Sequence, residues 1–222
     1  MLLYYITDRS QFPGDDGSRR RCLLEKIAQA PRCGVDYVQL REKDLSPRKL
    51  EMLAREVVAI IGELRTGNKK LKTELLINSR TDIALACGAN GVHLRAHDIS
   101  SAEVREIWTQ CGAGAFARVT VGVSCHTPTE VAGAAAHGAD FAVFGPIFDK
   151  KAAPDARPAG LDALRQACRE KIPVLALGGI TAQNAVACMQ AGAAGIAGIR
   201  LFQQSEMGRV VGELRGPNSH RL

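Results

Sequence analysis

The amino-acid sequence predicts a closed (β/α)8 barrel, chiefly because it contains a fourfold internal repeat. Four similar segments, GVDYVQL, GANGVHL, GADFAVF and GAAGIAGI, begin at residues 34, 88, 138 and 192. Their starts lie 54, 50 and 54 residues apart, which is long enough for two strand–helix units in each repeat. Eight apolar strands that alternate with helices imply a parallel sheet, and this alternation within 222 residues implies closure into a barrel.

We expect the barrel to be a single α/β domain over residues 1–222, because no linker or low-complexity stretch divides the chain. Residues 215–222 are expected to form a disordered tail. An open, doubly wound sheet is the alternative architecture, but it would not require a fourfold periodicity.

The expected strands fall into two sets that alternate along the chain. One set lies inside the glycine-led segments, where a glycine ends the preceding helix and an apolar run follows (34–40, 88–94, 138–144 and 192–199). The other set lies between those segments (2–7, 74–78, 119–124 and 173–179).

Amphipathic helices are expected between the strands. The helix over 47–65 places five apolar side chains on one face: Leu50, Leu53, Ala54, Val57 and Ile61. Helices over 127–137 and 181–191 each open with a threonine that can cap the first turn. Asp98 is a candidate cap for a further helix that starts near Ser100.

Composition limits the partners and the compartment. The net charge is +6, but the basic residues are spread over predicted helices and aromatic residues make up only 5% of the chain, so we expect no nucleic-acid partner. Apolar runs are far shorter than the ~20 residues of a membrane span, so we expect no membrane segment. Seven cysteines without a C-x-x-C pair indicate a reduced, cytoplasmic protein with no zinc site. Barrels of this size often pair, so a homodimer stays open.

Polar residues gather at the predicted carboxyl ends of the strands, where a barrel of this type places its active site. Several are cations, which indicates a cup for phosphate or pyrophosphate. In chain order the candidates are Gln39, Arg41, Lys43, Asn78, Ser79, His93, Asp98, Ser124, His126, Lys150, Lys151, Gly178, Gly179 and Gly198.

The clearest phosphate signal is LGGIT at 177–181. Its glycines would let backbone N–H groups approach a ligand, and a helix beginning near Thr181 would add its positive end. Glycines that merely form tight turns are the alternative. His93 is expected to be a hydrogen-bonded core or rim histidine rather than a catalyst.

Together these strand ends resemble the thiamine phosphate synthase family and its relative, the thiazole tautomerase (TenI-like) family. The resemblance rests on segments that occur in order over nearly the whole chain: YYITD (4–8), VQLREKD (38–44), LLINSRTDIALACGANGVHL (75–94), GVSCHT (122–127), GADFAVFGPIF (138–148) and LALGGI (175–180).

The resemblance implies coupling of hydroxymethylpyrimidine diphosphate to thiazole phosphate, with release of pyrophosphate and formation of thiamine phosphate. It implies a magnesium site at Asp98, with Ser79 beside it. It implies that the thiazole phosphate lies against Gly178, Gly179 and Gly198, and that pyrophosphate is held by Gln39, Arg41, Lys43, Asn78, Ser124 and either Lys150 or Lys151. His126 would shuttle a proton in the tautomerase.

Three departures from the synthase pattern keep other functions open. Ser79 stands where the synthase has its second magnesium-binding aspartate, Arg95-Ala96 replaces a glycine–glutamine pair, and 148–155 lacks the threonines that precede the loop lysine. The alternatives are the tautomerase, a non-catalytic thiamine-phosphate binder, and a Schiff-base aldolase that uses Lys43 or a loop lysine.

Overall fold

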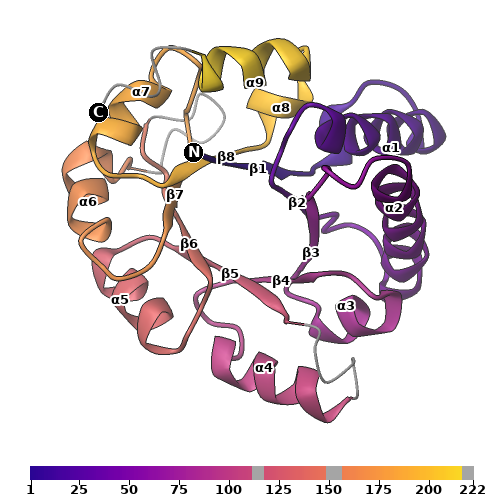
Figure 1. Cartoon of the computed structure of the whole chain (residues 1–222), viewed down its shortest axis with the longest axis horizontal. Coiled ribbons are helices and arrows are strands. Elements are labelled where there is room, and N and C mark those ends of the chain that lie inside the picture. The colour runs from indigo at the N-terminus through magenta and orange to yellow at the C-terminus, as the bar shows by residue number, and fades with distance from the viewer. Residues whose placement is uncertain (112–117, 149–156, 217–222) are drawn as a thin grey trace.

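The computed structural model describes residues 1–111, 118–148 and 157–216, and it contains the predicted closed barrel (Figure 1). Each strand pairs in parallel with its neighbours along the chain, and the last strand pairs with the first. The strands are β1 (Leu2–Ile6), β2 (Tyr37–Leu40), β3 (Glu74–Asn78), β4 (Gly91–Leu94), β5 (Thr120–Cys125), β6 (Phe141–Phe144), β7 (Val174–Ala176) and β8 (Gly195–Gly198).

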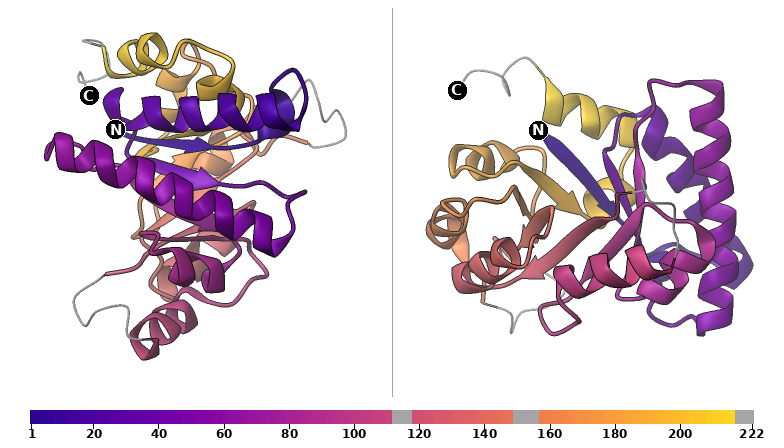
Figure 2. Two further views of the ribbon diagram at one scale, coloured as in Figure 1. Left: turned by 90° about the vertical axis from the view of Figure 1, so that its right-hand side faces the viewer. Right: turned by 60° about the horizontal axis from the view of Figure 1, so that its bottom comes forward.

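Helices wrap the outside of this barrel, and the strand arrows run together toward one end (Figure 2). Two helices, rather than one, follow the last strand. The helices are α1 (Asp16–Arg32), α2 (Pro47–Gly67), α3 (Thr81–Cys87), α4 (Ser101–Gln110), α5 (Pro128–Ala136), α6 (Gly160–Ala167), α7 (Ala185–Gln190), α8 (Arg200–Gln203) and α9 (Met207–Arg215), with a 3-10 turn, η1 (Arg9–Gln11), after β1.

The strands bury both of their faces, because side chains alternate between the barrel interior and the helical layer. Tyr4 points inward and contacts the Phe141 ring edge-on, with 5.3 Å between ring centroids. Its neighbour Tyr5 points outward and packs near Phe202 of α8. Gly122 leaves room for Phe141, since a Cβ atom there would lie 2.5 Å from that ring. The interior is therefore a packed core and leaves the barrel ends for binding.

Most expected helix signals are confirmed. The five apolar residues predicted on one face of 47–65 are all buried in α2, and the Ser46 side chain caps that helix. Thr127 caps α5 as predicted. The alternative role of Asp98 as the cap of α4 is wrong: Ser100 forms a capping box with Glu103, and Asp98 closes the turn that precedes it.

Two further expectations are corrected. The helix predicted from Thr181 begins at Ala185, because the side chains of Thr181 and Asn184 bond to each other's backbone N–H groups and form a turn. Arg215, the first residue of the predicted tail, instead ends α9 and pairs with Asp36 at 2.8 Å. Residues 217–222 lie outside the described part of the chain.

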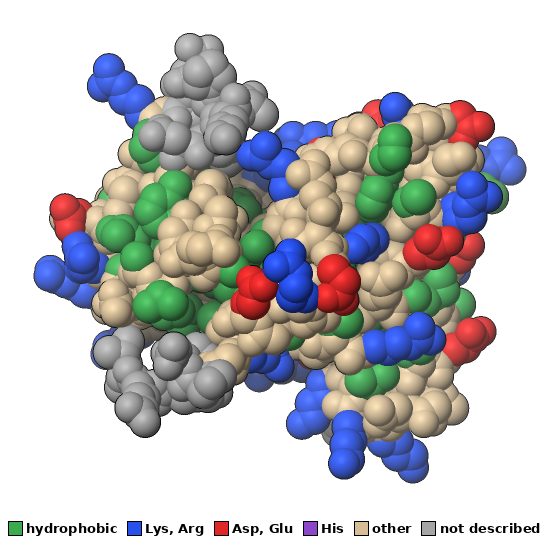
Figure 3. Space-filling model, turned by 90° about the horizontal axis from the view of Figure 1, so that it is seen from above, with side chains coloured by type: hydrophobic (Ala, Val, Ile, Leu, Met, Phe, Trp, Pro, Cys, Tyr) green, Lys and Arg blue, Asp and Glu red, His purple; other side chains and the backbone are tan. Residues whose placement is uncertain are grey.

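The surface carries charges of both signs. Figure 3 looks onto the side of the barrel that carries α8 and α9, where Lys and Arg side chains lie scattered and are interspersed with Asp and Glu. On this face the positive charge forms no continuous stripe. Of the helices that the structure describes, none has the length and apolar character to cross a bilayer.

Candidate functional site

A cavity of about 1250 Å³ opens at the carboxyl end of the barrel and collects most of the predicted site residues. Residues from seven of the eight strand ends line it, all except β6, because the parallel strands end together at this side of the barrel. The predicted residues found there are Gln39, Arg41, Lys43, Asn78, Ser79, His93, Ser124, His126, Gly178, Gly179 and Gly198. Asp98 lines a smaller adjoining cavity of about 380 Å³, and Lys150 and Lys151 lie outside the described residues.

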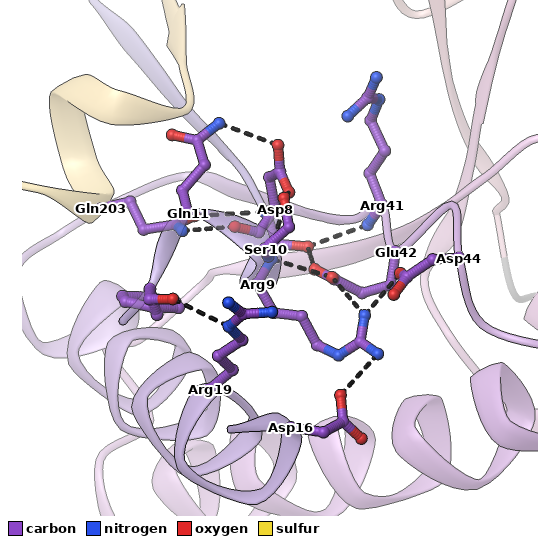
Figure 4. A network of polar contacts seen from close by, with 12 residues as sticks. Asp8, Arg9, Ser10, Gln11, Asp16, Arg19, Arg41, Glu42, Asp44 and Gln203 are labelled. Atoms are coloured by element: carbon purple, nitrogen blue, oxygen red, sulfur yellow. Dashed lines mark hydrogen bonds and ion pairs between the residues drawn. The ribbon is translucent and has the colours of Figure 1, made fainter. Parts of the chain in front are cut away.

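Arg41 and Lys43 reach the cavity because they alternate with Glu42 in the extended chain after β2. The Arg41 backbone N–H donates to the Thr7 hydroxyl at 3.0 Å, which fixes this segment against the end of β1. Figure 4 shows the Arg41 side chain extending away from the carboxylates that surround Arg9. Arg41 therefore presents its guanidinium to the cavity, whereas the Glu42 carboxylate, which also borders the cavity, is bonded to the end of β1.

Glu42 belongs to an ionic cluster, here called the Arg9 clamp, that consists of Arg9 and Glu42, which are buried, and of Asp16 and Asp44, which are exposed. Arg9 contacts Asp44 at 2.5 Å, Asp16 at 2.8 Å and Glu42 at 3.7 Å (Figure 4). Glu42 also accepts hydrogen bonds from the Thr7 hydroxyl at 2.6 Å and from the Arg9 N–H at 2.9 Å. The Arg9 clamp thus ties the segment after β1 to the segment that carries Arg41 and Lys43.

The cavity wall is strongly positive. The pKa of Lys43 is lowered mainly by the nearby Arg41 guanidinium, with smaller contributions from burial and from Arg95. Within the described residues, neither Arg41 nor Lys43 forms an ion pair. Cations held close together without carboxylate partners form a site for an anionic ligand.

Arg200 is a further cation of the cavity wall that sequence reasoning missed. It comes two residues after Gly198, at the start of α8, and within the described chain it makes no ion pair. A signal was available: Arg200 is the first charged residue after the last strand, at the end where the ligand site was expected. Gln204, one turn later, also lines the cavity and was missed.

The glycine loop after β7 lines the same cavity as Arg200, which follows the neighbouring strand β8. Gly178 and Gly179 have φ values of +98° and +67°, which only glycine adopts readily. Over the part of the chain that the structure describes, the N–H groups of Gly178, Gly179 and Ile180 have no hydrogen-bond acceptor. These three donors, rather than the short helix α7, form the anion-binding element predicted for this loop.

His93 is buried and hydrogen-bonded, as predicted. It is 2% exposed and bonds to the Tyr4 hydroxyl on one side and to the Ser124 hydroxyl on the other. Burial, helped by Arg41, lowers the pKa of His93 to about 3, so the imidazole is neutral. His93 therefore acts through its neighbours and brings no charge to the cavity.

Ser79 and Asp98 were the expected magnesium ligands. Ser79 adopts a left-handed backbone with φ of +55°, and its buried hydroxyl oxygen has no hydrogen-bond partner in the described structure. Burial tends to raise the pKa of Asp98, but the Arg95 N–H, the nearby Ser79 hydroxyl and the Arg95 guanidinium outweigh it and lower the pKa. Within the described residues no group of three His, Cys, Asp or Glu side chains converges. A hydroxyl oxygen close to one carboxylate fits Mg²⁺ that would take its other ligands from substrate phosphates and water.

The fold and the site together define a class. A closed parallel barrel with unpaired cations and free glycine-loop N–H groups at its carboxyl end is typical of (β/α)8-barrel proteins that bind phosphorylated small molecules. The particular family follows from sequence. The chain belongs to the thiamine monophosphate synthase family, whose sequence profile matches residues 3–202.

Individual relatives agree with this assignment. The chain is 43% identical over 197 residues to a Geobacter sulfurreducens protein with a provisional assignment as a thiamine-phosphate synthase, covering 88% of this chain and 83% of that protein. It is 36% identical over 197 residues to the thiamine-phosphate synthase of Syntrophomonas wolfei, covering 88% of this chain and 85% of that protein. The solved structure of thiamine phosphate pyrophosphorylase from Pyrococcus furiosus matches with a TM-score of 0.75 at 28% identity, covering 96% of this chain and 93% of that one.

Proposed function

We propose that this protein is a thiamine-phosphate synthase, which joins hydroxymethylpyrimidine diphosphate to thiazole phosphate and releases pyrophosphate. The observation that carries the proposal is one cavity that holds two sets of anion-binding groups. Arg41 and Lys43 follow β2, whereas the glycine loop and Arg200 follow β7 and β8. A reaction between two phosphorylated substrates requires two such sets.

The reaction requires the protein to supply positive charge and to position the substrates, and it requires no protein nucleophile. The C–O bond to pyrophosphate breaks, its electron pair leaves with the pyrophosphate, and the thiazole nitrogen supplies the electron pair for the new C–N bond. Arg41 and Lys43 stabilise the negative charge that grows on the leaving group, and this stabilisation is larger in the transition state than in the bound substrate. The glycine loop holds the thiazole phosphate, so that its ring nitrogen faces the electron-poor carbon.

Mg²⁺ is part of the proposal, although the donor set on the protein is small. Asp98 and the Ser79 hydroxyl would hold it together with phosphate oxygens of the substrate and water. The ion would neutralise charge on the departing pyrophosphate.

A cytoplasmic location also remains a proposal, supported by seven cysteines that are all free thiols.

Incubation with both substrates and Mg²⁺ tests the function directly. We expect thiamine phosphate and pyrophosphate to form in equal amounts. Substrate binding without turnover would indicate the non-catalytic binder, and borohydride trapping of a carbonyl substrate on Lys43 would indicate the aldolase. Either outcome would refute the synthase.

The tautomerase is the second candidate, and His126 favours it. Its Nδ1 atom bonds to the Gly145 carbonyl at 2.7 Å, which makes Nδ1 the protonated atom and leaves Nε2 for the cavity. An imidazole with one ring nitrogen free toward the cavity is suited to moving a proton on the thiazole. Proton exchange on the thiazole carboxylate phosphate without any coupling product would decide for this function.

Ser79→Asp should reduce the Mg²⁺ requirement of the coupling reaction. Aspartate tolerates the left-handed backbone of this position and would add a second carboxylate beside Asp98. We expect the half-maximal Mg²⁺ concentration to fall roughly tenfold in a rate titration. Ser79→Asn is the matched control, because it fits the same backbone without the charge. Identical titrations for the two variants would contradict the assigned metal position.

Arg200→Ala should weaken binding of one substrate and spare the other. Loss of a charged donor beside the glycine loop is expected to raise KM for thiazole phosphate about tenfold, with KM for the pyrimidine diphosphate nearly unchanged. Arg209→Ala removes the same charge from the exposed face of α9 and serves as the control. Steady-state kinetics with each substrate varied in turn makes the measurement. An equal rise in both KM values would place Arg200 elsewhere than at the thiazole phosphate.

A further inference from the structure

A chain of hydrogen bonds crosses the barrel interior and ends at the cavity. The Gln39 amide nitrogen lies 3.0 Å from the Tyr4 hydroxyl, which lies 3.1 Å from Nδ1 of His93. Nε2 of His93 lies 2.8 Å from the Ser124 hydroxyl. Gln39, Tyr4 and His93 are at most 2% exposed, whereas Ser124 is partly exposed and lines the cavity. Three buried groups therefore act on one accessible hydroxyl.

The donors in this chain point in one direction. The Gln39 amide nitrogen can only donate, so the Tyr4 oxygen accepts from it and the Tyr4 proton goes to Nδ1 of His93. Burial raises the pKa of Tyr4 far above its usual value, which keeps that proton in place. The His93 ring is buried between two hydroxyl groups and has no carboxylate bonded to it, which favours the neutral ring. A neutral ring that accepts at Nδ1 carries its proton at Nε2. His93 must then donate to the Ser124 oxygen.

We infer that Tyr4 and His93 are positioning residues, which fix the Ser124 hydroxyl as a hydrogen-bond donor toward the anionic end of the substrate. Because the Ser124 oxygen already accepts from His93, its own hydrogen is free for the cavity. If these hydrogen bonds ran in the opposite direction, the Ser124 hydroxyl would donate to His93 and would present only its lone pairs to the phosphate. The inference rests on the proposed function, in which the ligand at this end is the departing pyrophosphate.

The arrangement explains why a neutral histidine lies so close to an anion site. A charged imidazole would add attraction, but burial without a carboxylate partner disfavours that charge. A neutral histidine with a fixed tautomer instead determines that the Ser124 hydroxyl donates its hydrogen bond toward the cavity. The His93 ring has no other hydrogen-bond partner in the described structure, since both of its nitrogens belong to this series of hydrogen bonds.

Tyr4→Phe removes only the hydroxyl that fixes the tautomer. We measure binding of inorganic pyrophosphate with Mg²⁺ by calorimetry, and kcat/KM for coupling, in the native and Ser124→Ala backgrounds. With Ser124 present, both quantities should fall about tenfold, and in Ser124→Ala the same change should have little further effect. Tyr5→Phe is the matched control, because Tyr5 is equally buried but bonds to Gln203 outside the barrel interior. Equal losses in both backgrounds, or no loss, would overturn the inference.

A second measurement needs no variant. The ¹⁵N chemical shifts of the His93 ring in the native protein should report a neutral ring protonated at Nε2 from acidic to neutral pH. A ring protonated at Nδ1 would refute the inference even if Tyr4→Phe folds poorly. Native protein that binds no pyrophosphate would refute both this inference and the proposed function. Pyrophosphate binding that Tyr4→Phe leaves unchanged would refute the inference alone.

Discussion

Arg41→Ala should reduce kcat and kcat/KM for coupling together, by roughly 30- to 1,000-fold, or about 2–4 kcal/mol of transition-state stabilisation. Arg41 lies in the cavity without a carboxylate partner among the described residues, so its charge is available to a ligand. The charge on the leaving group grows as the C–O bond breaks, and the loss should therefore fall mainly on kcat. Single-turnover measurements of pyrophosphate release make the comparison, since they report the chemical step.

Two controls separate this effect from folding and from net charge. Arg41→Ala keeps the backbone N–H that bonds to Thr7, so the thermal unfolding midpoint should stay close to the native value. Arg65→Ala removes the same charge in the last turn of α2, away from the cavity, and should leave kcat/KM unchanged. A full coupling rate in Arg41→Ala would remove the residue from the mechanism. An equal loss in Arg65→Ala would show that the effect comes from the change in net charge and not from the position of Arg41.

Arg9→Met should destabilise the fold by about 3 kcal/mol, because it leaves the Glu42 carboxylate buried without its cation. The side chains of Arg9 and Glu42 are 8% and 1% exposed, so water replaces little of the lost interaction. Burial already raises the pKa of Glu42, and removal of Arg9 should raise it further. The loss of unfolding free energy in Arg9→Met should become smaller as the pH falls through that raised pKa, since a protonated Glu42 carries no charge. Urea unfolding at several pH values measures the change.

A double variant tests the cause. Arg9→Met combined with Glu42→Gln should recover most of the lost stability, because a neutral amide still accepts the Thr7 hydrogen bond. Arg55→Met removes an exposed partner of Glu51 on α2 and should cost only about 0.5 kcal/mol. If the double variant is no more stable than Arg9→Met, the loss comes from packing of the Arg9 side chain rather than from the isolated charge of Glu42.

The barrel could be predicted because its signals repeat. All eight expected strands occur. For four of them, a glycine-led apolar run indicates both the end of a helix and the buried strand that follows it within a few residues. Helix starts were less certain. Thr181 looked like a cap, but Asn184 competes for the same backbone groups and delays α7 to Ala185. Asp98 and Ser100 are both good cap residues, but Glu103, three residues after Ser100, completes a capping-box pattern that favours Ser100.

The site was predictable only in part, for a related reason. Arg41 and Lys43 stand out because they alternate with a buried residue at a strand end. Arg200 lacks such a pattern, and only the closed barrel brings it beside the glycine loop. The sequence likewise gave no sign that Glu42, between two ligand-facing cations, belongs to the Arg9 clamp.

Short-range patterns in the chain were sufficient to determine the number and order of the strands, the end of the barrel that binds ligand, and the family. They depend on residues a few positions apart, whose side chains must share or alternate faces. Tertiary structure alone decided which polar groups are paired and which are free. Tyr4, His93 and Ser124 meet only because three strands close around one interior, and the direction of their hydrogen bonds depends on burial that no local segment possesses.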